Sequence, residues 1–201
     1  MNILLHICCS NCALYPVRIT RKEGHDFAGF WFNPNIHPHE EHESRLKSLT
    51  WLSNDWKFEL ISEEGYRPEE YFQMFGMSED EGEAPPFPDR CASCYRLRLE
   101  KTAAYARGQG FDAFSTTLLI SPYQDFERII STGKELAEQY NVQFYIKDYR
   151  PHFREAMDLS RKLGLYRQKY CGCIFSLEER SRNKQKHRDK GSKAQRHKVK
   201  N

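Results

Sequence analysis

Five apolar runs alternate along the chain with longer segments in which apolar residues recur three and four positions apart. The runs are rich in β-branched and aromatic residues, which favours strands, whereas the longer segments favour helices. Strands are predicted at residues 2–7, 26–32, 57–61, 111–120 and 142–146. Helices are predicted at residues 13–23, 43–55, 67–75, 91–110, 123–140 and 152–165. This alternation is typical of an α/β domain with a mostly parallel sheet and helices on both faces.

Cysteines occupy the loop after the first predicted strand, in the sequence CCSNC at residues 8–12. In parallel sheets of this kind, ligands bind beyond the carboxyl ends of the strands. A second loop, at residues 77–90, is acidic and rich in Pro and Gly. Compact domains seldom carry so long a loop without a functional reason. We therefore expect the functional site, with its cysteine loops, at the carboxyl ends of the strands.

The size of the chain, 201 residues, favours one domain, which we place at residues 1–179. Hydrophobic residues make up 39% of the chain, so a packed core can form without disulfides. No apolar run approaches the roughly 20 residues needed to span a bilayer, and the apolar start is too short for a secretory signal. We therefore expect a cytoplasmic protein with no membrane contact.

Basic residues concentrate at the end of the chain. Residues 180–201 contain ten Lys or Arg and one Asp, a formal charge of +9, whereas the preceding 179 residues contain 21 basic and 27 acidic side chains, a charge of −6. Because this segment has almost no apolar residues, it is predicted to be a disordered arm attracted to polyanions such as nucleic acids. A solubilising extension is the alternative.

Seven cysteines fall in three tight clusters. They are Cys8, Cys9 and Cys12, then Cys91 and Cys94, and finally Cys171 and Cys173. This grouping argues against a secreted disulfide framework and favours metal binding or redox chemistry in a reducing compartment. Seven thiols are too many for one zinc site, which takes at most four, and are enough for a four-cysteine iron-sulfur cluster plus a second thiolate site.

We assign the cluster to Cys8, Cys9, Cys91 and Cys94. A CxxC pair lets two thiolates reach neighbouring irons, and the predicted helix N-terminus at Cys91 favours the thiolate form. In an alternative that spacing leaves open, Cys12 replaces Cys8 or Cys9 as a ligand. A structural zinc site with buried free thiols is the simpler alternative.

The CxC pair indicates different chemistry. Cys171 and Cys173 enclose only Gly172, so they would close a small, strained disulfide of the easily reduced kind. We predict that they form a redox-active dithiol. Alternatively, they bind a second metal, a mononuclear iron, together with Cys12.

Five segments together resemble the cobalamin-independent epoxyqueuosine reductases, the QueH family. They are HICCSNC, FWFNPNIHP, PDRCASCYRLRLEKTA, FSTTLLISPYQD and LGLYRQKYCGCIFS, in this order between about Asn2 and Phe175. The resemblance implies a Rossmann-like sheet of the PP-loop/HUP-like group, a [4Fe-4S] cluster on the four cysteines assigned above, and redox-active cysteines in YCGC. One departure is Ser10-Asn11, where the family commonly has Ala-Pro.

The resemblance further implies an oxidoreductase that reduces the epoxide of epoxyqueuosine at the tRNA wobble position to queuosine. Its partners would be tRNA bearing epoxyqueuosine and a low-potential electron donor. Removing the epoxide oxygen as water takes two electrons and two protons. The candidate proton donors are Asp89, which is alternatively an iron ligand or a helix cap, and Tyr123, with Tyr95, Asp125 and Tyr170 as further candidates.

Recognition of a wobble nucleoside calls for stacking and phosphate contacts. Stacking is predicted for Phe30, Trp31, Phe32 and Tyr123, and phosphate contact for Arg96, Arg98, Arg154 and Arg167. The histidines at positions 37, 39 and 42 are interpreted as solvated or phosphate-facing. Two rival classes are a zinc-stabilised RNA-binding module and a PP-loop tRNA thiolation enzyme. The second needs a Gly/Ser-rich phosphate loop where this chain has CCSNC.

Overall fold

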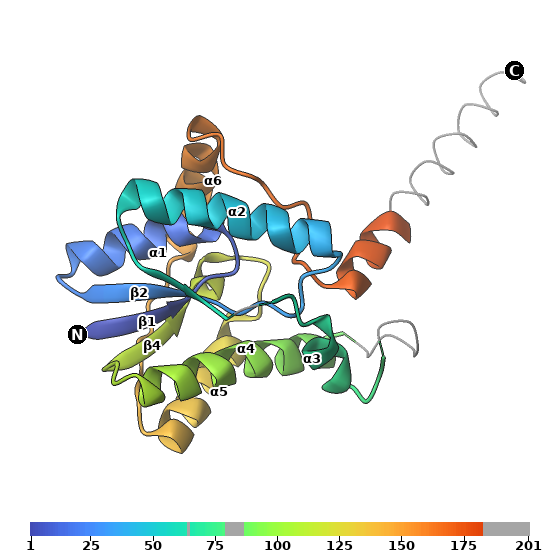
Figure 1. The fold of residues 1–201 in the computed structure, drawn as a ribbon, viewed down its shortest axis with the longest axis horizontal. Coiled ribbons are helices and arrows are strands. Elements are labelled where there is room, and N and C mark those ends of the chain that lie inside the picture. Colours follow the sequence, from blue (N-terminus) through green and yellow to red (C-terminus); the bar gives the residue numbers. More distant parts are fainter. Residues whose placement is uncertain (64, 79–86, 183–201) are drawn as a thin grey trace, which may run out of the picture.

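A single five-stranded parallel sheet forms the centre of the protein (Figure 1). The computed structural model describes residues 1–63, 65–78 and 87–182. The strands are β1 (Asn2–His6), β2 (Asp26–Trp31), β3 (Leu60–Ser62), β4 (Ala113–Thr116) and β5 (Gln143–Phe144). The predicted parallel sheet is confirmed, and its order is β3-β2-β1-β4-β5.

The central strand, β1, pairs with β2 on one side and β4 on the other, so that Ile3 lies in register with Phe27 and Ala113. From β1 the chain runs outward to β3 and then crosses back to β4 and β5. The direction of travel therefore reverses at β1. Such a reversal opens a crevice at the carboxyl ends of the strands, where ligands bind in sheets of this type.

Helices cover both faces of the sheet, as predicted (Figure 1). One face carries α1 (Ser10–Lys22), α2 (His39–Trp56) and α6 (Phe153–Lys162). The other carries α4 (Asp89–Gly108) and α5 (Phe126–Tyr140). Beyond the carboxyl ends of the strands lie α3 (Pro68–Gln73) and a helix at residues 174–182. Two 3-10 helices span Thr117–Ile120 and Arg150–His152.

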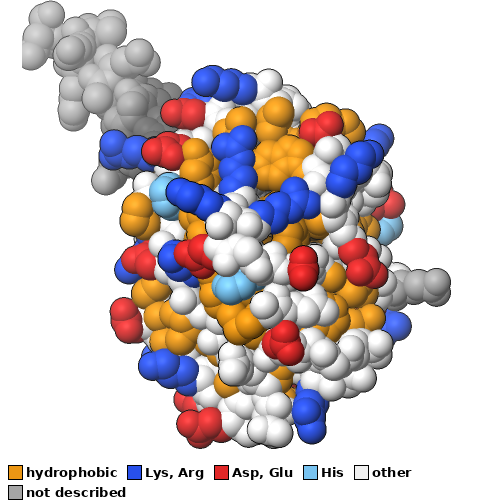
Figure 2. Space-filling view, turned by 90° about the vertical axis from the view of Figure 1, so that its left-hand side faces the viewer, with side chains coloured by type: hydrophobic (Ala, Val, Ile, Leu, Met, Phe, Trp, Pro, Cys, Tyr) orange, Lys and Arg blue, Asp and Glu red, His pale blue; other side chains and the backbone are white. Residues whose placement is uncertain are grey.

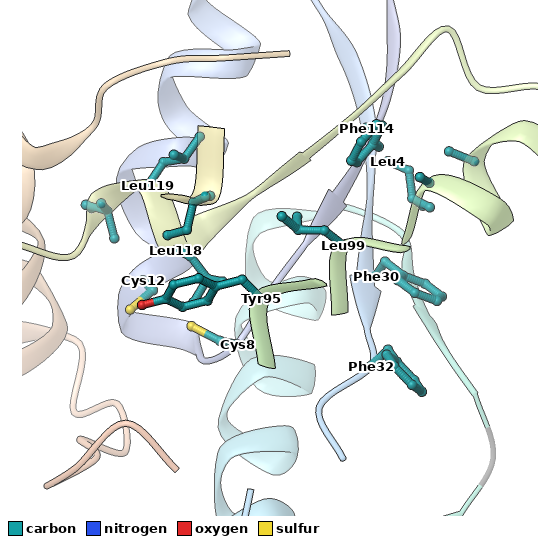
Figure 3. Close-up of a cluster of buried hydrophobic side chains, with 14 of the residues drawn as sticks. Leu4, Cys8, Cys12, Phe30, Phe32, Tyr95, Leu99, Phe114, Leu118 and Leu119 are labelled. Carbon is teal, nitrogen blue, oxygen red and sulfur yellow. The ribbon is translucent and has the colours of Figure 1, made fainter. Parts of the chain in front are cut away.

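Side chains that alternate along β1 divide the core between the two faces. Leu4 belongs to a cluster with Phe114 and Leu99 of α4, and Leu5 to a cluster with Leu49 of α2. Each fully buried Leu side chain contributes roughly 1.5–3 kcal/mol, so β1 is anchored from both sides. Figure 3 shows the first cluster, which extends to the sulfur atoms of Cys8 and Cys12 and to the ring of Tyr95.

Several predicted boundaries differ from the structure, and the two largest differences are at β4 and α2. The predicted strand at residues 111–120 is the shorter β4 followed by a 3-10 helix, because the Thr116 hydroxyl accepts a hydrogen bond from the N–H of Leu118 at 3.1 Å and caps that turn. The helix predicted to start at residue 43 starts at His39.

Parts of two predicted segments lie outside the described residues. In the predicted basic tail, residues 180–182 continue the helix that starts at residue 174, and residues 183–201 are not described. In the predicted acidic loop, residues 79–86 are not described. Within the described ranges, no helix has the length and apolar character needed to cross a membrane.

Candidate metal and redox site

An open cavity of about 460 Å³ lies beyond the carboxyl ends of β1 and β4, and six of the seven cysteines line it. These six are Cys8, Cys12, Cys91, Cys94, Cys171 and Cys173. The seventh, Cys9, is buried, and its Sγ lies 3.9 Å from that of Cys8. Three segments far apart in the sequence therefore converge where the sheet was expected to bind a ligand.

The first cysteine cluster is built by the start of α1. Cys9 is the N-cap of this helix, and its Sγ accepts a hydrogen bond from the N–H of Cys12 at 3.4 Å. The helix therefore begins at Ser10, and Cys12 lies in its first turn rather than in the predicted loop. The Sγ atoms of Cys8, Cys9 and Cys12 all lie within 4.8 Å of one another. Burial raises the pKa of Cys9 above its ordinary value, and hydrogen bonds with Cys8 and Cys9 raise that of Cys12, so of the three only Cys8 favours the thiolate form.

The second cluster lies in the first two turns of α4, near the helix N-terminus as predicted. Cys94 is buried and Cys91 is half-buried. Both line the same cavity as Cys8 and Cys12, although they lie about 80 residues away in the sequence. α4 is held against the sheet by Leu99 and Ala103, which are buried in the same core cluster as Cys8. The helix that carries CxxC is thus fixed relative to the strand that carries CCSNC.

The third cluster lies in an irregular segment. The Sγ atoms of Cys171 and Cys173 are 3.7 Å apart, and that of Cys171 lies 3.0 Å from the Ser176 hydroxyl. Hydrogen bonds from Cys173 and Ser176 lower the pKa of Cys171 to about 5, and the same contact raises the pKa of Cys173 above its ordinary value. The pair therefore holds one thiolate next to one protonated thiol at neutral pH.

A buried arginine of α2 that the sequence did not single out, Arg45, fixes this third segment. Its Nη1 donates to the carbonyl of Cys171 at 3.1 Å and its Nη2 to the carbonyl of Tyr170 at 3.0 Å. Its Nε donates to Glu41 at 2.8 Å, and its side chain is 1% exposed. From the other side, the Gly172 carbonyl accepts a hydrogen bond from the His37 N–H at 2.8 Å.

Positive charge surrounds the thiols. Six cations line the cavity, and no carboxylate lines it among the described residues. The cations are Arg45, Arg90, Arg98, Arg167, Lys169 and Arg180. On the side of the molecule at the amino ends of the strands, by contrast, acidic and basic side chains are mixed (Figure 2). The cavity is therefore suited to anionic ligands.

Arg98 is the most deeply buried of these cations after Arg45. Its Nε donates to the carbonyl of Cys94 at 3.1 Å. Hydrogen bonds from Cys12 and Cys9 hold the pKa of Cys8 well below its ordinary value, and the charge of Arg98 acts in the same direction. Burial raises the pKa of Cys94 to about 11, and Arg98 opposes that rise. Arg98 is therefore buried against the backbone, where its charge acts on the nearby thiols, and it does not lie on the surface as its predicted phosphate contact required.

The predicted proton donors lie at different depths. Tyr123 is 82% exposed at the rim of the cavity, with its ring against Phe153. Asp89 is exposed in the first turn of α4 and does not line the cavity. It is not the cap of that helix, because the N-cap is Pro88. Asp125 instead caps α5 by accepting a hydrogen bond from the N–H of Arg128.

Two predictions about exposed residues are wrong. His37 and His42 are buried, and the Trp31 indole N–H donates to Nε2 of His42 at 3.1 Å. Burial lowers the pKa of each of these two histidines to about 4, so they are neutral and not phosphate ligands. The aromatic side chains predicted to stack on a base are also buried, except for Tyr123; they are Phe30, Trp31 and Phe32.

The donors in the cavity fit a soft metal or an iron-sulfur cluster. Thiols are the ligands of such sites, and in the described part of the chain neither a carboxylate nor an imidazole lines this cavity. The buried triad of Cys8, Cys9 and Cys12 is close enough to share a metal, and two more thiols face it from α4.

Comparisons with known proteins agree with this geometry. The family model described as "Epoxyqueuosine reductase QueH" matches residues 3–179. Proteins named epoxyqueuosine reductase QueH from Dehalococcoides mccartyi and Thermotoga maritima are 39% and 36% identical to this chain. Each alignment covers 89% of this chain, and they cover 94% and 92% of those proteins.

Two solved structures share the fold. The U34-tRNA thiolase NcsA from Methanococcus maripaludis, solved with its [4Fe-4S] cluster, has a TM-score of 0.52 at 12% identity over 84% of this chain and 58% of its own. A predicted subunit of tRNA methyltransferase from Methanocaldococcus jannaschii has a TM-score of 0.51 at 13% identity over 80% and 74%. These likenesses agree with the predicted α/β fold built on a parallel sheet. The family match over residues 3–179 and the identity to these relatives show that the chain belongs to the epoxyqueuosine reductase QueH family of oxidoreductases.

Proposed function

We propose that this protein reduces the epoxide of epoxyqueuosine at the wobble position of tRNA to the cyclopentene of queuosine, using a [4Fe-4S] cluster and a redox-active cysteine pair. The observation that carries the proposal is the convergence of six thiols on one cation-lined cavity in a chain of this family. The cluster ligands are Cys8, Cys9, Cys91 and Cys94. When bound, a [4Fe-4S] cluster supplies electrons one at a time.

The chemistry at the cysteine pair balances with one external proton. Cys171 and Cys173 together give up two electrons as their sulfurs form one S–S bond, and the Cys173 thiol gives up one proton. The epoxide takes up these two electrons, that proton and a second proton from a separate donor, loses its oxygen as water and becomes an alkene. The hydrogen-bonded arrangement of one thiolate and one thiol supports this role, because thiolates are the reactive form. A low-potential donor then has to reduce the pair through the cluster.

A mononuclear iron bound by this pair with Cys12 is the alternative role. Metal analysis separates the two, because the alternative requires one iron beyond those of the cluster. Tyr123 and Asp89 are the proposed proton donors near the epoxide oxygen. Tyr123 has the better position, because it stands at the rim of the cavity.

The cavity also fits the proposed RNA substrate. Single-stranded loops are recognised by extruding a base and holding the backbone by cations. Arg167, Lys169 and Arg180 line the cavity, and the exposed ring of Tyr123 can stack on a base. The basic segment at residues 183–201 adds charge that attracts the polyanion.

The test is to incubate anaerobically purified protein with reductant and tRNA that carries epoxyqueuosine, and to analyse the nucleosides by mass spectrometry. We expect queuosine to appear, and we expect a broad absorbance band near about 400 nm from the cluster. Unchanged epoxide in the presence of an intact cluster would contradict the proposal. Colourless protein that binds zinc and RNA would favour the zinc-stabilised RNA-binding module instead.

A further inference from the structure

Two side-chain amides link the segment after α6 to the first cysteine cluster. The Asn11 side-chain amide donates from Nδ2 to Oε1 of Gln168 at 2.9 Å. The Gln168 side-chain amide donates from Nε2 to the Sγ of Cys9 at 3.0 Å, and this nitrogen lies 3.8 Å from the Sγ of Cys12. Asn11 is buried in the first turn of α1, and Gln168 is half-buried in the wall of the cavity.

The direction of this chain of hydrogen bonds follows from the chemistry of the sulfur. A metal-bound cysteine sulfur carries no proton, so it only accepts hydrogen bonds. Gln168 must then point its NH2 group at Cys9 and its side-chain oxygen at Asn11. Asn11 must in turn donate a hydrogen bond to that oxygen from its own NH2 group. The arrangement in the structure is therefore the one that a liganded Cys9 requires.

We infer that Gln168 is a positioning residue that raises the reduction potential of the cluster by hydrogen bonding to a ligand sulfur, and that Asn11 orients it. This inference rests on the proposed function, which makes Cys9 a ligand. Reduction adds negative charge to the cluster and its sulfurs, and an N–H donor stabilises that charge. The inference also holds if Cys12 replaces Cys9, because Gln168 reaches both sulfurs.

The experiment measures the midpoint potential of the cluster in anaerobic protein by a redox titration followed by EPR. Gln168→Leu removes the N–H donor at similar side-chain size. We expect its one-electron reduction equilibrium to become about tenfold less favourable, which equals 59 mV. Gln168→Glu, which brings a carboxylate, lowers the potential further. Asn11→Ala lowers it by less than Gln168→Leu, because the donor remains but is free to turn.

The matched control is Gln124→Leu. Gln124 lines the same cavity, and across the described residues its side chain donates no hydrogen bond to a sulfur. We expect the potential of this variant to equal that of the unmodified protein. An equal shift in both Leu variants would overturn the inference, because the cause would then be a general change in the polarity of the cavity.

The outcomes separate this inference from the proposed function. If Gln168→Leu protein holds the cluster at an unchanged potential, the inference is wrong and the proposed function stands. If Gln168→Leu protein loses the cluster, the midpoint potential of Asn11→Ala protein becomes the test, because this variant keeps all seven cysteines and Gln168. An unchanged potential in Asn11→Ala protein then rejects the inference. If the unmodified protein binds no iron, both fail.

Discussion

The cysteines of this protein are held in place in two different ways. The first and second clusters lie at the starts of α1 and α4, two regular helices packed on the sheet. The pair Cys171 and Cys173 lies between α6 and the helix at residues 174–182, in a segment without regular structure. This segment depends on single side-chain contacts from elsewhere, of which the buried guanidinium of Arg45 is the most extensive.

This difference matches the two kinds of chemistry proposed for the site. A cluster shared by distant segments needs ligands whose positions do not change, and helices anchored in the core supply them. A dithiol that alternates between an S–S bond and two thiols changes its sulfur separation at each cycle, from the 3.7 Å seen here to about 2.05 Å when bonded. An irregular segment accommodates that change more readily than a helix does.

Replacing one cysteine in each region has the largest expected effect and tests the division directly. Cys91→Ala removes a ligand, so we expect most of the iron and the visible colour to be lost while far-UV circular dichroism still shows a folded protein. Cys173→Ala should keep the cluster and lose epoxide reduction. Iron content and absorbance decide. Colour that survives in Cys91→Ala, or disappears in Cys173→Ala, would show that the two regions have been assigned the wrong roles.

Replacing Arg45 by Met tests how the irregular segment is held. The change removes three hydrogen bonds and leaves Glu41, whose side chain is only 11% exposed, without its cation. Breaking such a buried pair costs about 3 kcal/mol or more, measured as the free energy of unfolding in urea. Arg96→Met is the matched control, because Arg96 pairs with Glu135 on the surface and should change stability by less than about 1 kcal/mol. Equal losses of unfolding free energy in the two variants would mean that Arg45 does not hold the irregular segment in place.

Replacing Gly172 by Ala should have a smaller effect, confined to the same segment. Gly172 has φ of 124°, which L side chains rarely adopt, and an added Cβ would lie 3.0 Å from Cγ1 of Ile36 and 3.3 Å from Nη1 of Arg45. We expect a cost of about 1–3 kcal/mol in unfolding free energy, with iron content unchanged. Gly108→Ala, at an open position in α4, should be neutral or stabilising.

The fold was largely predictable because periodicity reports it directly. All five strands and six helices lie where the alternation of apolar residues placed them. The boundaries were missed where capping was unusual. α1 starts three residues early because the sulfur of Cys9 caps it, and thiols are not among the common N-cap side chains. The order of the strands was not predictable, because it depends on which strands pair across long separations in sequence.

The site was predictable only as far as residue chemistry marks it. Cysteine clusters stand out in any sequence, and the structure brings all three to one place. Arg45 and Gln168 were missed because their roles come from contacts across 126 and 159 residues, and a single arginine or glutamine in a helix or loop carries no signal of that kind. The histidines at positions 37 and 42 were misjudged because their polar neighbours in sequence are not their neighbours in space.

The smallest expected effect concerns the acidity of one thiol. Hydrogen bonds from Cys173 and Ser176 lower the pKa of Cys171 to about 5, so in metal-free, reduced protein its thiolate should be fully formed above about pH 6. The rate of alkylation of Cys171 by iodoacetamide, followed by mass spectrometry, should therefore rise through pH 5 and stay level from pH 6 to 8. Cys173→Ala removes the larger cause and should move the rise to higher pH, and Ser176→Ala should move it less. If the unmodified protein instead reacts ever faster up to about pH 9, as an ordinary thiol does, then the irregular segment does not prepare Cys171 for reaction, and it differs from the segments that carry the other cysteines only in its lack of regular structure.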